Sequence, residues 1–421
     1  MDELIKVMGT SVFLSRDLIE HPESLDILLS PELSIPCKRK EDIFSAFLAE
    51  ASSEKDYETK LDGIRRLKSQ ELFRIGMNDI AGALTLRQVS NQITFTAEAA
   101  LEAAIVLAKG ELKERFGEAP TGAFSVIGMG KLGGRELIYG SDLDIIFVYT
   151  DKAEARTTGP KEISSHEYFV KLGQRIISAL TLRTKEGFVF NVDARLRPSG
   201  SAGPLVVSEE ALLKYHAGTT QIWERQALTK ARAAAGDLSF GAKVVRKLWD
   251  ELYARELTPI DVDEMLRIRA RMEVEIAKED ATRYNIKTGV GGINDCEFLV
   301  QAMQLKWGGS KKGLQTPYTM KALSRLGHEK LLTGEDLQAV KEAYLFMRSI
   351  ETRQRIVHDR PEGYLYKETE ELAALARRLG YTGTDAGVKL LKAYAGYAEK
   401  VRKVYGKTLI DLKGGQSATN P

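Results

Sequence analysis

Two aspartates at the start of an apolar run are the strongest candidates for chemistry in this sequence. Asp142 and Asp144 stand two positions apart, directly before the run Ile145–Tyr149. In a β-strand successive side chains point to opposite faces, so both carboxylates would project from one face. Neighbouring carboxylates repel each other unless a cation lies between them, and divalent cations bind carboxylate oxygens. The pair therefore predicts a divalent metal site.

A third aspartate and two arginines could complete such a site. Asp193 ends the apolar run Phe188–Val192, so it reaches the same sheet edge if the two strands are neighbours. Three carboxylates at one edge can hold two metal ions, of which one activates an attacking oxygen and the other steadies a triphosphate and its leaving group. Arg195 and Arg197 follow at intervals of two. They could hold phosphate, counter the carboxylates or form a structural salt bridge.

A glycine turn, Gly128–Gly134, precedes the aspartates and follows the apolar run Phe124–Ile127. Glycine-rich backbone can approach a phosphate chain closely. A dinucleotide-binding fingerprint is disfavoured because the segment up to Asp142 is short for a crossover helix, and because the ribose-binding acid is expected about 20 residues on. A P-loop is disfavoured because Gly and Arg follow Gly133, where that motif requires Lys and Ser or Thr.

Together these motifs resemble the signature of the glutamine synthetase adenylyltransferases. The similar segments are the glycine turn with its continuation to Leu137, Gly140–Asp144, Asp193–Gly200, Trp223–Leu228 and Gly291–Phe298. These enzymes belong to the DNA polymerase beta-like nucleotidyltransferases, in which a glycine turn precedes an Asp-x-Asp pair and a third carboxylate lies on a later strand. The resemblance implies an α+β, mostly helical fold, in which a polymerase beta-like mixed sheet core is flanked by N-terminal helices and a C-terminal helical bundle.

The resemblance gives the three aspartates catalytic and metal-binding roles. Asp142 and Asp144 would bridge two Mg²⁺ ions, and Asp193 would bind the ion that activates the acceptor hydroxyl. ATP would be the nucleotide substrate. An isolated aspartate at a strand end is usually a turn or capping residue, but the family match favours the functional interpretation for all three.

The resemblance also implies a set of residues near the nucleotide. They belong to the glycine turn, the ends of the predicted strands and a later basic pair: Gly130, Lys131, Gly133, Gly134, Ser141, Arg195, Arg197, Lys230 and Arg232. Gly130, Lys131 and Ser141 would approach the triphosphate through backbone N–H groups, a point charge and a hydroxyl. A tight turn is an equal alternative for the two later glycines. A solvated helix face is an equal alternative for the last two residues of the set.

A further family block lies in the C-terminal part of the chain. Its matching residues are Lys287, Gly291, Gly292, Asp295 and Glu297. The glycines suggest a close approach of the backbone to a nucleotide, a protein or a neighbouring helix, and the sequence leaves these three alternatives open.

The implied activity is transfer of AMP from ATP to a tyrosine hydroxyl of glutamine synthetase, with release of pyrophosphate. Complete members of the family fuse two catalytic halves, one that adds AMP and one that removes it by phosphorolysis, and this chain carries one core. Tyr139–Asp144 and Asp193–Gly200 are more similar to the adenylylating half. The removing half, with the same three aspartates, is the alternative. Glutamine synthetase and a PII-type signal protein are the expected partners, with glutamine as an effector.

Two rival functions are compatible with the fold. A module that senses PII or glutamine without turnover is disfavoured because such a module has no need of all three carboxylates. A nucleic-acid polymerase of the same superfamily is disfavoured because the formal net charge is +2 and no basic strip interleaved with aromatic residues is present. No nucleic-acid partner is therefore expected.

The composition indicates a globular protein of two or three domains. The chain has 421 residues, of which 43% are apolar. Its two cysteines, Cys37 and Cys296, form no disulfide framework, and no apolar run approaches the roughly 18 residues of a membrane span. We therefore expect a cytoplasmic protein without a membrane partner.

Apolar periodicity divides the chain into four regions. Residues 1–120 and 258–412 are predicted to be helical, residues 121–257 to form the nucleotidyltransferase core, and residues 413–421 to be a disordered tail. The predicted core elements are strands Phe124–Ile127, Ile145–Tyr149, Phe188–Val192 and Leu205–Val207, a helix His166–Leu182, and a helix that begins after Ser208. In the C-terminal region a helix is predicted to begin at Thr333, and an apolar stripe to pack as core: Met265, Ile268, Met272 and Ile276.

Overall fold

The chain forms two compact units in a computed structural model, which describes residues 9, 11–20, 35–150, 155–218, 220–358 and 363–414. Unit 1 comprises Met1–Thr219 and Lys230–Leu248, and unit 2 comprises Thr220–Thr229 and Trp249–Pro421. The segment Thr220–Thr229 thus belongs to unit 2 although unit 1 flanks it in sequence on both sides. The domain limits expected at residues 120, 257 and 412 remain predictions.

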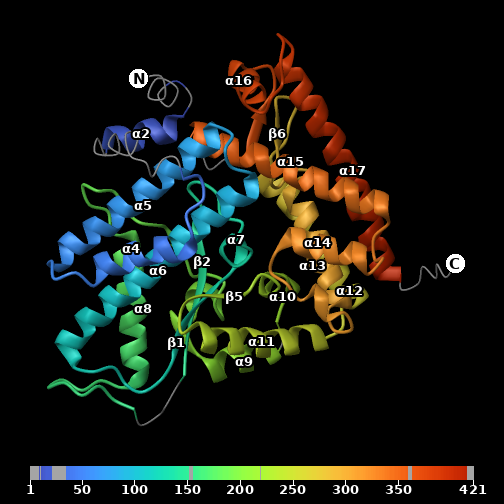
Figure 1. The fold of residues 1–421 in the computed structure, drawn as a ribbon. Coiled ribbons are helices and arrows are strands. Elements are labelled where there is room, and N and C mark those ends of the chain that lie inside the picture. Colours follow the sequence, from blue (N-terminus) through green and yellow to red (C-terminus); the bar gives the residue numbers. More distant parts are fainter. Residues whose placement is uncertain are drawn as a thin grey trace. The chain divides into compact units, whose positions relative to one another are not determined.

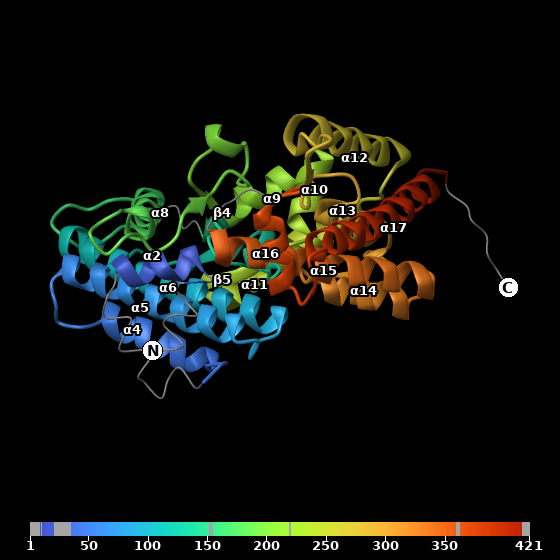
Figure 2. The same ribbon diagram turned by 90° about the horizontal axis from the view of Figure 1, so that it is seen from above.

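Long helices precede the sheet of unit 1. They are α2 (Val12–Glu20), α4 (Lys40–Ala51), α5 (Tyr57–Ile80) and α6 (Leu86–Phe116). Asp56 caps α5 by accepting a hydrogen bond from the backbone N–H of Thr59, and Thr85 begins α6 through a capping box with Gln88. In Figures 1 and 2, α4 and α5 lie beside α6, and the three helices pack against one another. The alanine-rich part of α6 is almost entirely buried.

The sheet of unit 1 is mixed and has the strand order β3-β2-β1-β5, with β4 also paired to β2. The strands are β1 (Phe124–Gly128), β2 (Leu143–Tyr149), β3 (Val192–Asp193), β4 (Val206–Ser208) and β5 (Arg232–Gly236). β1 runs antiparallel to β2 and β5, whereas β3 and β4 run parallel to β2. The α+β, mostly helical fold predicted from the sequence is confirmed.

Two features of this sheet differ from the prediction. The run Phe188–Val192 is not a strand along its length, because the backbone N–H groups of Val189 and Phe190 donate to the carbonyl of Leu180 at the end of the preceding helix. Pairing with β2 begins only at Val192. β5 was not predicted, since Arg-Ala-Ala-Ala-Gly lacks the β-branched and aromatic residues that mark a strand.

Helices cover both faces of the sheet. α8 (Ser165–Thr181) confirms the helix predicted over His166–Leu182, and its Phe169 stacks on Phe124 of β1 with ring centroids 5.8 Å apart. Ser125 follows Phe124 on β1, so its side chain points to the opposite face of the sheet. On that face Gly241 of α11 (Leu238–Ala254) packs directly against Ser125. α9 (Glu209–Ala217) begins after Ser208, whose side chain accepts from the backbone N–H of Ala211 as predicted.

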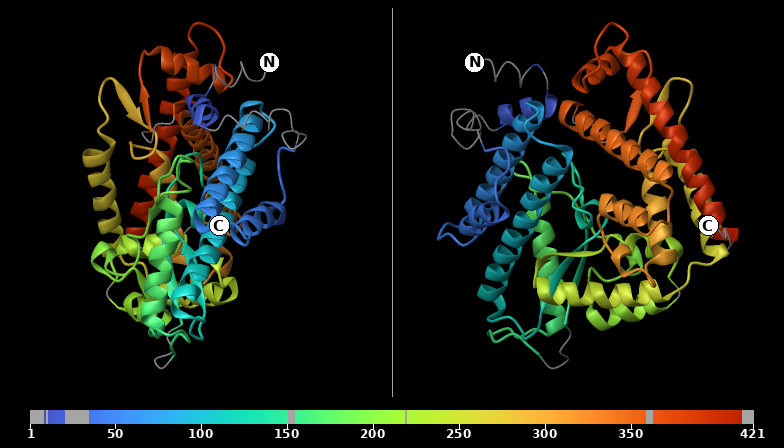
Figure 3. Two further views of the ribbon diagram at one scale, coloured as in Figure 1. Left: turned by 90° about the vertical axis from the view of Figure 1, so that its left-hand side faces the viewer. Right: turned by 45° about the vertical axis from the view of Figure 1, so that its right-hand side comes forward.

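Unit 2 is a helical assembly with one small ribbon. Its helices are α10 (Ile222–Leu228), α12 (Pro259–Met272), α13 (Ile293–Trp307), α14 (Thr319–His328), α15 (Gly334–His358), α16 (Glu370–Arg378) and α17 (Ala386–Gly414). α17, in red in Figure 3, contacts α12, α13, α15 and α16. The predicted start of α15 is confirmed, since Thr333 Oγ1 accepts from the N–H of Asp336. The antiparallel strands β6 (Arg283–Asn285) and β7 (Tyr364–Tyr366) were not predicted.

The predicted apolar stripe of α12 is wrong in its second half. Met265 is buried, but Ile276 is 53% exposed. The α-helix ends at Met272 and gives way to a π-helical turn, η4 (Glu273–Ala277), which changes the spacing of the residues that follow. Arg269, which is not part of the stripe, is 1% exposed.

The described part of the chain contains no helix whose length and apolar character suit a membrane crossing. Helix α17 extends to Gly414, and the rest of the tail predicted to be disordered lies outside the described residues.

Candidate functional site

The register of the sheet places two of the three aspartates side by side. β2 and β3 pair in parallel with Asp144 opposite Asp193, so their side chains leave the same face of adjacent strands. The backbone N–H of Leu143 also donates to the carbonyl of Asn191 at 2.9 Å, which ties the two strands together at this edge. Asp142 directly precedes β2 and is exposed to solvent.

Arg195 supplies the positive charge closest to the third carboxylate. Its Nε lies 3.0 Å from each carboxylate oxygen of Asp193, and its backbone N–H donates to Oδ1 at 2.8 Å. These hydrogen bonds lower the pKa of Asp193 below its ordinary value, so the group is ionised at neutral pH. The side-chain bonds also raise the pKa of Arg195, and the charges of Asp144 and Asp142 add to that shift. All three carboxylates therefore stabilise the positive charge of one guanidinium, that of Arg195.

The first residue of α7 (Gly130–Gly133) touches the carboxylate of Asp144. Gly130 has φ +48°, and a Cβ atom on it would stand 2.4 Å from Asp144 Oδ2. The backbone N–H of Met129 donates to the carbonyl of Asp144 at 2.8 Å. Glycine is required here by both the left-handed backbone and the close contact. The glycine turn and the aspartate pair thus form one local structure.

The remaining candidates of this turn differ in what they contact. A Cβ atom at Gly133 would stand 1.8 Å from the carbonyl oxygen of Lys230, which favours the tight-packing interpretation for this glycine. Gly134 has ordinary right-handed backbone angles. Ser141 Oγ accepts from the backbone N–H of Ile138 at 3.0 Å and closes the turn before β2. Lys131 follows Gly130 on α7 and is partly exposed.

Three of the basic candidates form hydrogen bonds or ion pairs with other groups of the protein. Arg197 donates to the carbonyls of Ala194 and Gly203 and so braces its own loop. Lys230 Nζ lies 2.8 Å from Glu136 Oε2. Arg232 lies on β5, not on a solvated helix face, and donates to main-chain carbonyls of the glycine turn. These contacts favour a structural role for each.

The side chains present are of the type that holds a hard divalent cation, because all three donors are carboxylates and two of them stand in register. Within the described residues, no group of three or more His, Cys, Asp or Glu side chains is arranged to hold a metal ion. Asp193 instead faces Arg195. Since the guanidinium is largely exposed, the carboxylate can exchange this partner for a cation, and the donor set fits Mg²⁺.

Sequence reasoning missed two buried carboxylates near this site. Asp79 of α5 accepts a hydrogen bond from Tyr139 Oη at 3.1 Å, immediately before the Gly-Ser-Asp-Leu-Asp segment. Glu98 of α6 is fully buried and pairs with Arg232. A signal was available for Glu98, because a carboxylate within an alanine-rich helical run lies on a face that must pack.

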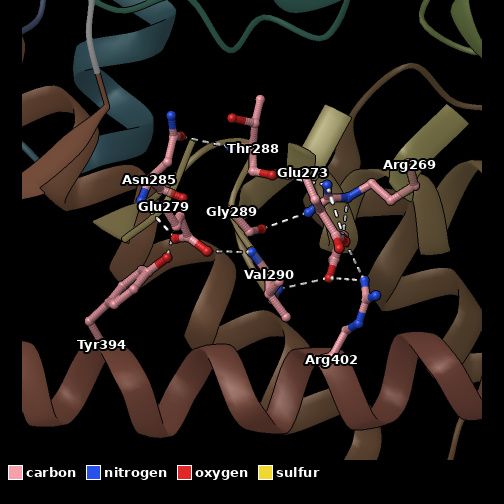
Figure 4. A network of polar contacts seen from close by, with 11 residues as sticks. Arg269, Glu273, Glu279, Asn285, Thr288, Gly289, Val290, Tyr394 and Arg402 are labelled. Atoms are coloured by element: carbon pink, nitrogen blue, oxygen red, sulfur yellow. Dashed lines mark hydrogen bonds and ion pairs between the residues drawn. The ribbon is translucent and has the colours of Figure 1, made fainter. Parts of the chain in front are cut away.

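The second family block forms a buried network in unit 2, shown in Figure 4. Asp295 pairs with Arg269 and accepts from the backbone N–H of Gly291 at 2.8 Å, while Arg269 donates to the carbonyl of Gly289 at 2.6 Å. Arg402 of α17 reaches Asp295 at 3.2 Å. These bonds connect α12, α13 and α17 through the loop that precedes α13.

The glycines of this block serve close packing. Gly291 has φ +71°, and a Cβ atom on it would stand 1.9 Å from the carbonyl oxygen of Ala398 on α17. A Cβ atom at Gly292 would meet main-chain carbonyls of its own loop. Of the three alternatives left open by the sequence, the structure shows the approach to a neighbouring helix.

Two family profiles and several curated relatives match this chain. The family profile described as glutamate-ammonia ligase adenylyltransferase matches residues 1–247, and that described as GlnD PII-uridylyltransferase matches residues 266–409. The bifunctional glutamine synthetase adenylyltransferase/adenylyl-removing enzyme of Nitrosococcus oceani is 34% identical over 400 residues, which are 93% of this chain and 41% of the relative. That of Thioalkalivibrio sulfidiphilus is 34% identical over 390 residues, 90% of this chain and 39% of the relative.

A similar enzyme of the same name from Burkholderia mallei is 35% identical over 352 residues, which are 80% of this chain and 38% of the relative. The chain thus spans about two fifths of the length of the curated relatives that it matches. The first profile covers more than half of the chain, including the glycine turn and all three aspartates. The chain therefore belongs to the glutamate-ammonia ligase adenylyltransferase family.

Proposed function

We propose that this chain transfers AMP from ATP to a tyrosine hydroxyl of glutamine synthetase and releases pyrophosphate. The observation that carries the proposal is the register of Asp144 with Asp193, next to a glycine turn whose Gly130 touches the Asp144 carboxylate. The names of the relatives, glutamine synthetase adenylyltransferase/adenylyl-removing enzyme, supply the substrate.

In this proposal the residues at the sheet edge have separate roles in the reaction. Asp142, Asp144 and Asp193 would hold two Mg²⁺ ions, which would supply positive charge to the triphosphate and lower the pKa of the acceptor hydroxyl. The acceptor oxygen forms a bond to the α-phosphorus while the bond to the pyrophosphate oxygen breaks. Gly130 lets the backbone of the glycine turn approach the Asp144 carboxylate because it carries no side chain. Arg195 gives up Asp193 and becomes available to the negative charge of the phosphates.

The proposed partners follow from the same comparisons. Glutamine synthetase is the acceptor, and the match of residues 266–409 to a profile named for PII uridylyltransferases supports recognition of a PII-type protein. Glutamine as an effector remains a prediction of the sequence resemblance. The reducing cytoplasm is the proposed compartment, and the two cysteines are free.

The test is direct. The chain is incubated with unmodified glutamine synthetase, Mg²⁺, glutamine and α-labelled ATP, and the intact mass of the target is measured. A gain of one AMP per modified subunit that is lost with Asp144→Asn supports the proposal. Loss of AMP from a pre-adenylylated target in the presence of phosphate, without any gain in the forward direction, assigns the chain to the removing activity. No change in either direction contradicts both.

A further inference from the structure

A buried carboxylate of α6 lies at the centre of a cluster of basic side chains. Glu98 is 0% exposed, and its oxygens lie 2.5 Å from Arg232 Nη2, 2.7 Å from Lys40 Nζ and 4.0 Å from Arg135 Nε. Removal of one partner from a buried ion pair leaves an uncompensated charge and is strongly unfavourable. Glu98 therefore forms close ion pairs with side chains of two separate segments, α4 and β5, and a longer one with Arg135.

Arg232 connects this carboxylate to the glycine turn. Its Nη2 donates to the carbonyl of Leu132 at 2.8 Å, and its Nε donates to the carbonyl of Gly133 at 3.0 Å. Carbonyls at the end of a helical turn lack the partner that a longer helix would supply four residues on, so the planar guanidinium helps to satisfy them. Helix α7 thus contacts Asp144 through its first residue, Gly130, and Arg232 through its last two, Leu132 and Gly133.

Two further contacts fix the same part of the turn. The carbonyl oxygen of Lys230 lies so close to Gly133 that no Cβ atom fits between them. The side chain of Lys230 pairs with Glu136 at 2.8 Å. The segment leading into β5 and the residues just after the turn are therefore held together by packing and by charge.

We propose that Glu98 is a positioning residue for the glycine turn. Through Arg232 it holds the turn against Asp144, so the affinity for nucleotide depends on a carboxylate that touches no nucleotide. The inference rests on the proposed function for its ligand, an ATP-like triphosphate, but its structural part can be tested without turnover. It also changes the role of Arg232 from a nucleotide contact, as the family resemblance implies, to a positioning residue.

The two roles of Arg232 predict opposite effects of Glu98→Gln. If Arg232 binds phosphate directly, loss of the competing carboxylate frees the guanidinium, and affinity rises or stays the same. If Arg232 positions the turn, loss of Glu98 loosens the turn, and affinity falls. A displacement of about 1 Å in a site costs on the order of tenfold to a hundredfold in function.

The experiment measures binding of α,β-methylene-ATP with Mg²⁺ to the full chain by calorimetry. Glu98→Gln should weaken binding about tenfold. Glu111→Gln is the matched control, because Glu111 lies on the same helix and pairs with Arg115 and Arg175 at 3.3 Å and 3.2 Å, away from the turn. That control should stay within about twofold of wild type. Unchanged or tighter binding by Glu98→Gln would overturn the proposal.

Hydrogen exchange of the nucleotide-free chain gives a second readout. It keeps the proposal testable through another variant if Glu98→Gln folds poorly. Arg232→Lys keeps a cation beside Glu98 but loses the planar fork. It should accelerate exchange at the amides of Gly133 and Gly134 about tenfold relative to amides of α8. Equal acceleration in α8 indicates a general loss of stability and contradicts positioning. A wild-type chain that fails to bind nucleotide, while Arg232→Lys and Glu98→Gln both show the local acceleration, contradicts the proposed function and supports positioning of the turn by Glu98 through Arg232.

Discussion

Two Asp–Arg pairs in the family-like segments of this chain have opposite environments. At the sheet edge of unit 1, the side chains of Asp193 and Arg195 are 20% and 78% exposed. In the network of unit 2, the side chains of Asp295 and Arg269 are 0% and 1% exposed. The guanidinium of Arg195 donates to Asp193, whereas that of Arg269 also donates to the carbonyls of Thr288 and Gly289.

This difference separates a pair that can exchange partners from one that cannot. Water and salt screen an exposed pair, so its dissociation costs little. A fully buried pair that also satisfies main-chain carbonyls cannot open without leaving several groups uncompensated. We infer that the edge of unit 1 is suited to binding, and that the network of unit 2 holds its helices together.

The largest expected effect is on the stability of unit 2. Asp295→Asn removes the closer of the two carboxylates that pair with the buried Arg269 and leaves Glu273, at 3.4 Å, as its remaining counter-charge. This loss should lower the free energy of unfolding by about 3 kcal/mol. Urea denaturation followed by circular dichroism measures the change. Asp193→Asn is the matched substitution at the exposed pair and should cost less than about 1 kcal/mol. Equal losses in the two variants would remove the distinction between the pairs.

Turnover should depend on the edge aspartates with little effect on folding. Asp144→Asn removes a charge beside the glycine turn and should lower the rate of AMP transfer by about 10²–10³-fold. The rate is followed with labelled ATP and glutamine synthetase, and thermal denaturation serves as the control for folding. Near-normal transfer by Asp144→Asn and by Asp193→Asn would refute the assignment of these residues.

Gly130→Ala should affect both stability and transfer. The left-handed backbone at φ +48° should cost about 1–2 kcal/mol with an alanine side chain, and the new methyl group must displace the carboxylate of Asp144. Gly82→Ala is the matched control, because Gly82 has φ +74° but a Cβ atom on it would meet no atom within 4 Å. Both variants should lose stability, and only Gly130→Ala should lose transfer activity. Equal activity in the two variants contradicts the contact with Asp144.

The smallest effect is a pH dependence of stability at the exposed pair. The hydrogen bond from Arg195 lowers the pKa of Asp193 in the folded chain, so the stabilisation is complete above the unfolded pKa of about 3.9 and is lost as pH falls through the lower folded value. The urea midpoint of Arg195→Gln should lie slightly below that of wild type at pH 7, and the gap should narrow toward about pH 3. If the difference in urea midpoint persists or widens at that pH, the ionised Asp193 is not the cause of the stabilisation.

Residue spacing was sufficient to predict that Asp144 and Asp193 meet at one sheet edge, but not what surrounds them. Asp142 and Asp144 were identifiable because they interrupt the start of an apolar strand, and Asp193 because it ends another apolar run. The alanine-rich β5 carried no such signal, so the strand that leads Arg232 to the glycine turn was missed. Short strands of this kind are stabilised by their neighbours, and local propensity does not reveal them.

The direction of long basic side chains was also beyond the sequence. Arg197 and Arg232 occupy positions compatible with phosphate binding, yet both donate to main-chain carbonyls. Which partner an arginine takes depends on groups distant in sequence, such as Glu98 for Arg232. The same holds for Arg269, whose burial follows from Asp295 and not from the periodicity of its own helix.

The most direct test of the central distinction is the affinity for Mn²⁺, measured by electron paramagnetic resonance in the presence of α,β-methylene-ATP. Asp193→Asn should weaken Mn²⁺ binding at least about tenfold, because it removes a proposed ligand. Arg402→Gln, which removes one cation from the unit 2 network, should leave the affinity within about twofold of wild type. Unchanged binding by Asp193→Asn, or a comparable loss by Arg402→Gln, would contradict the account.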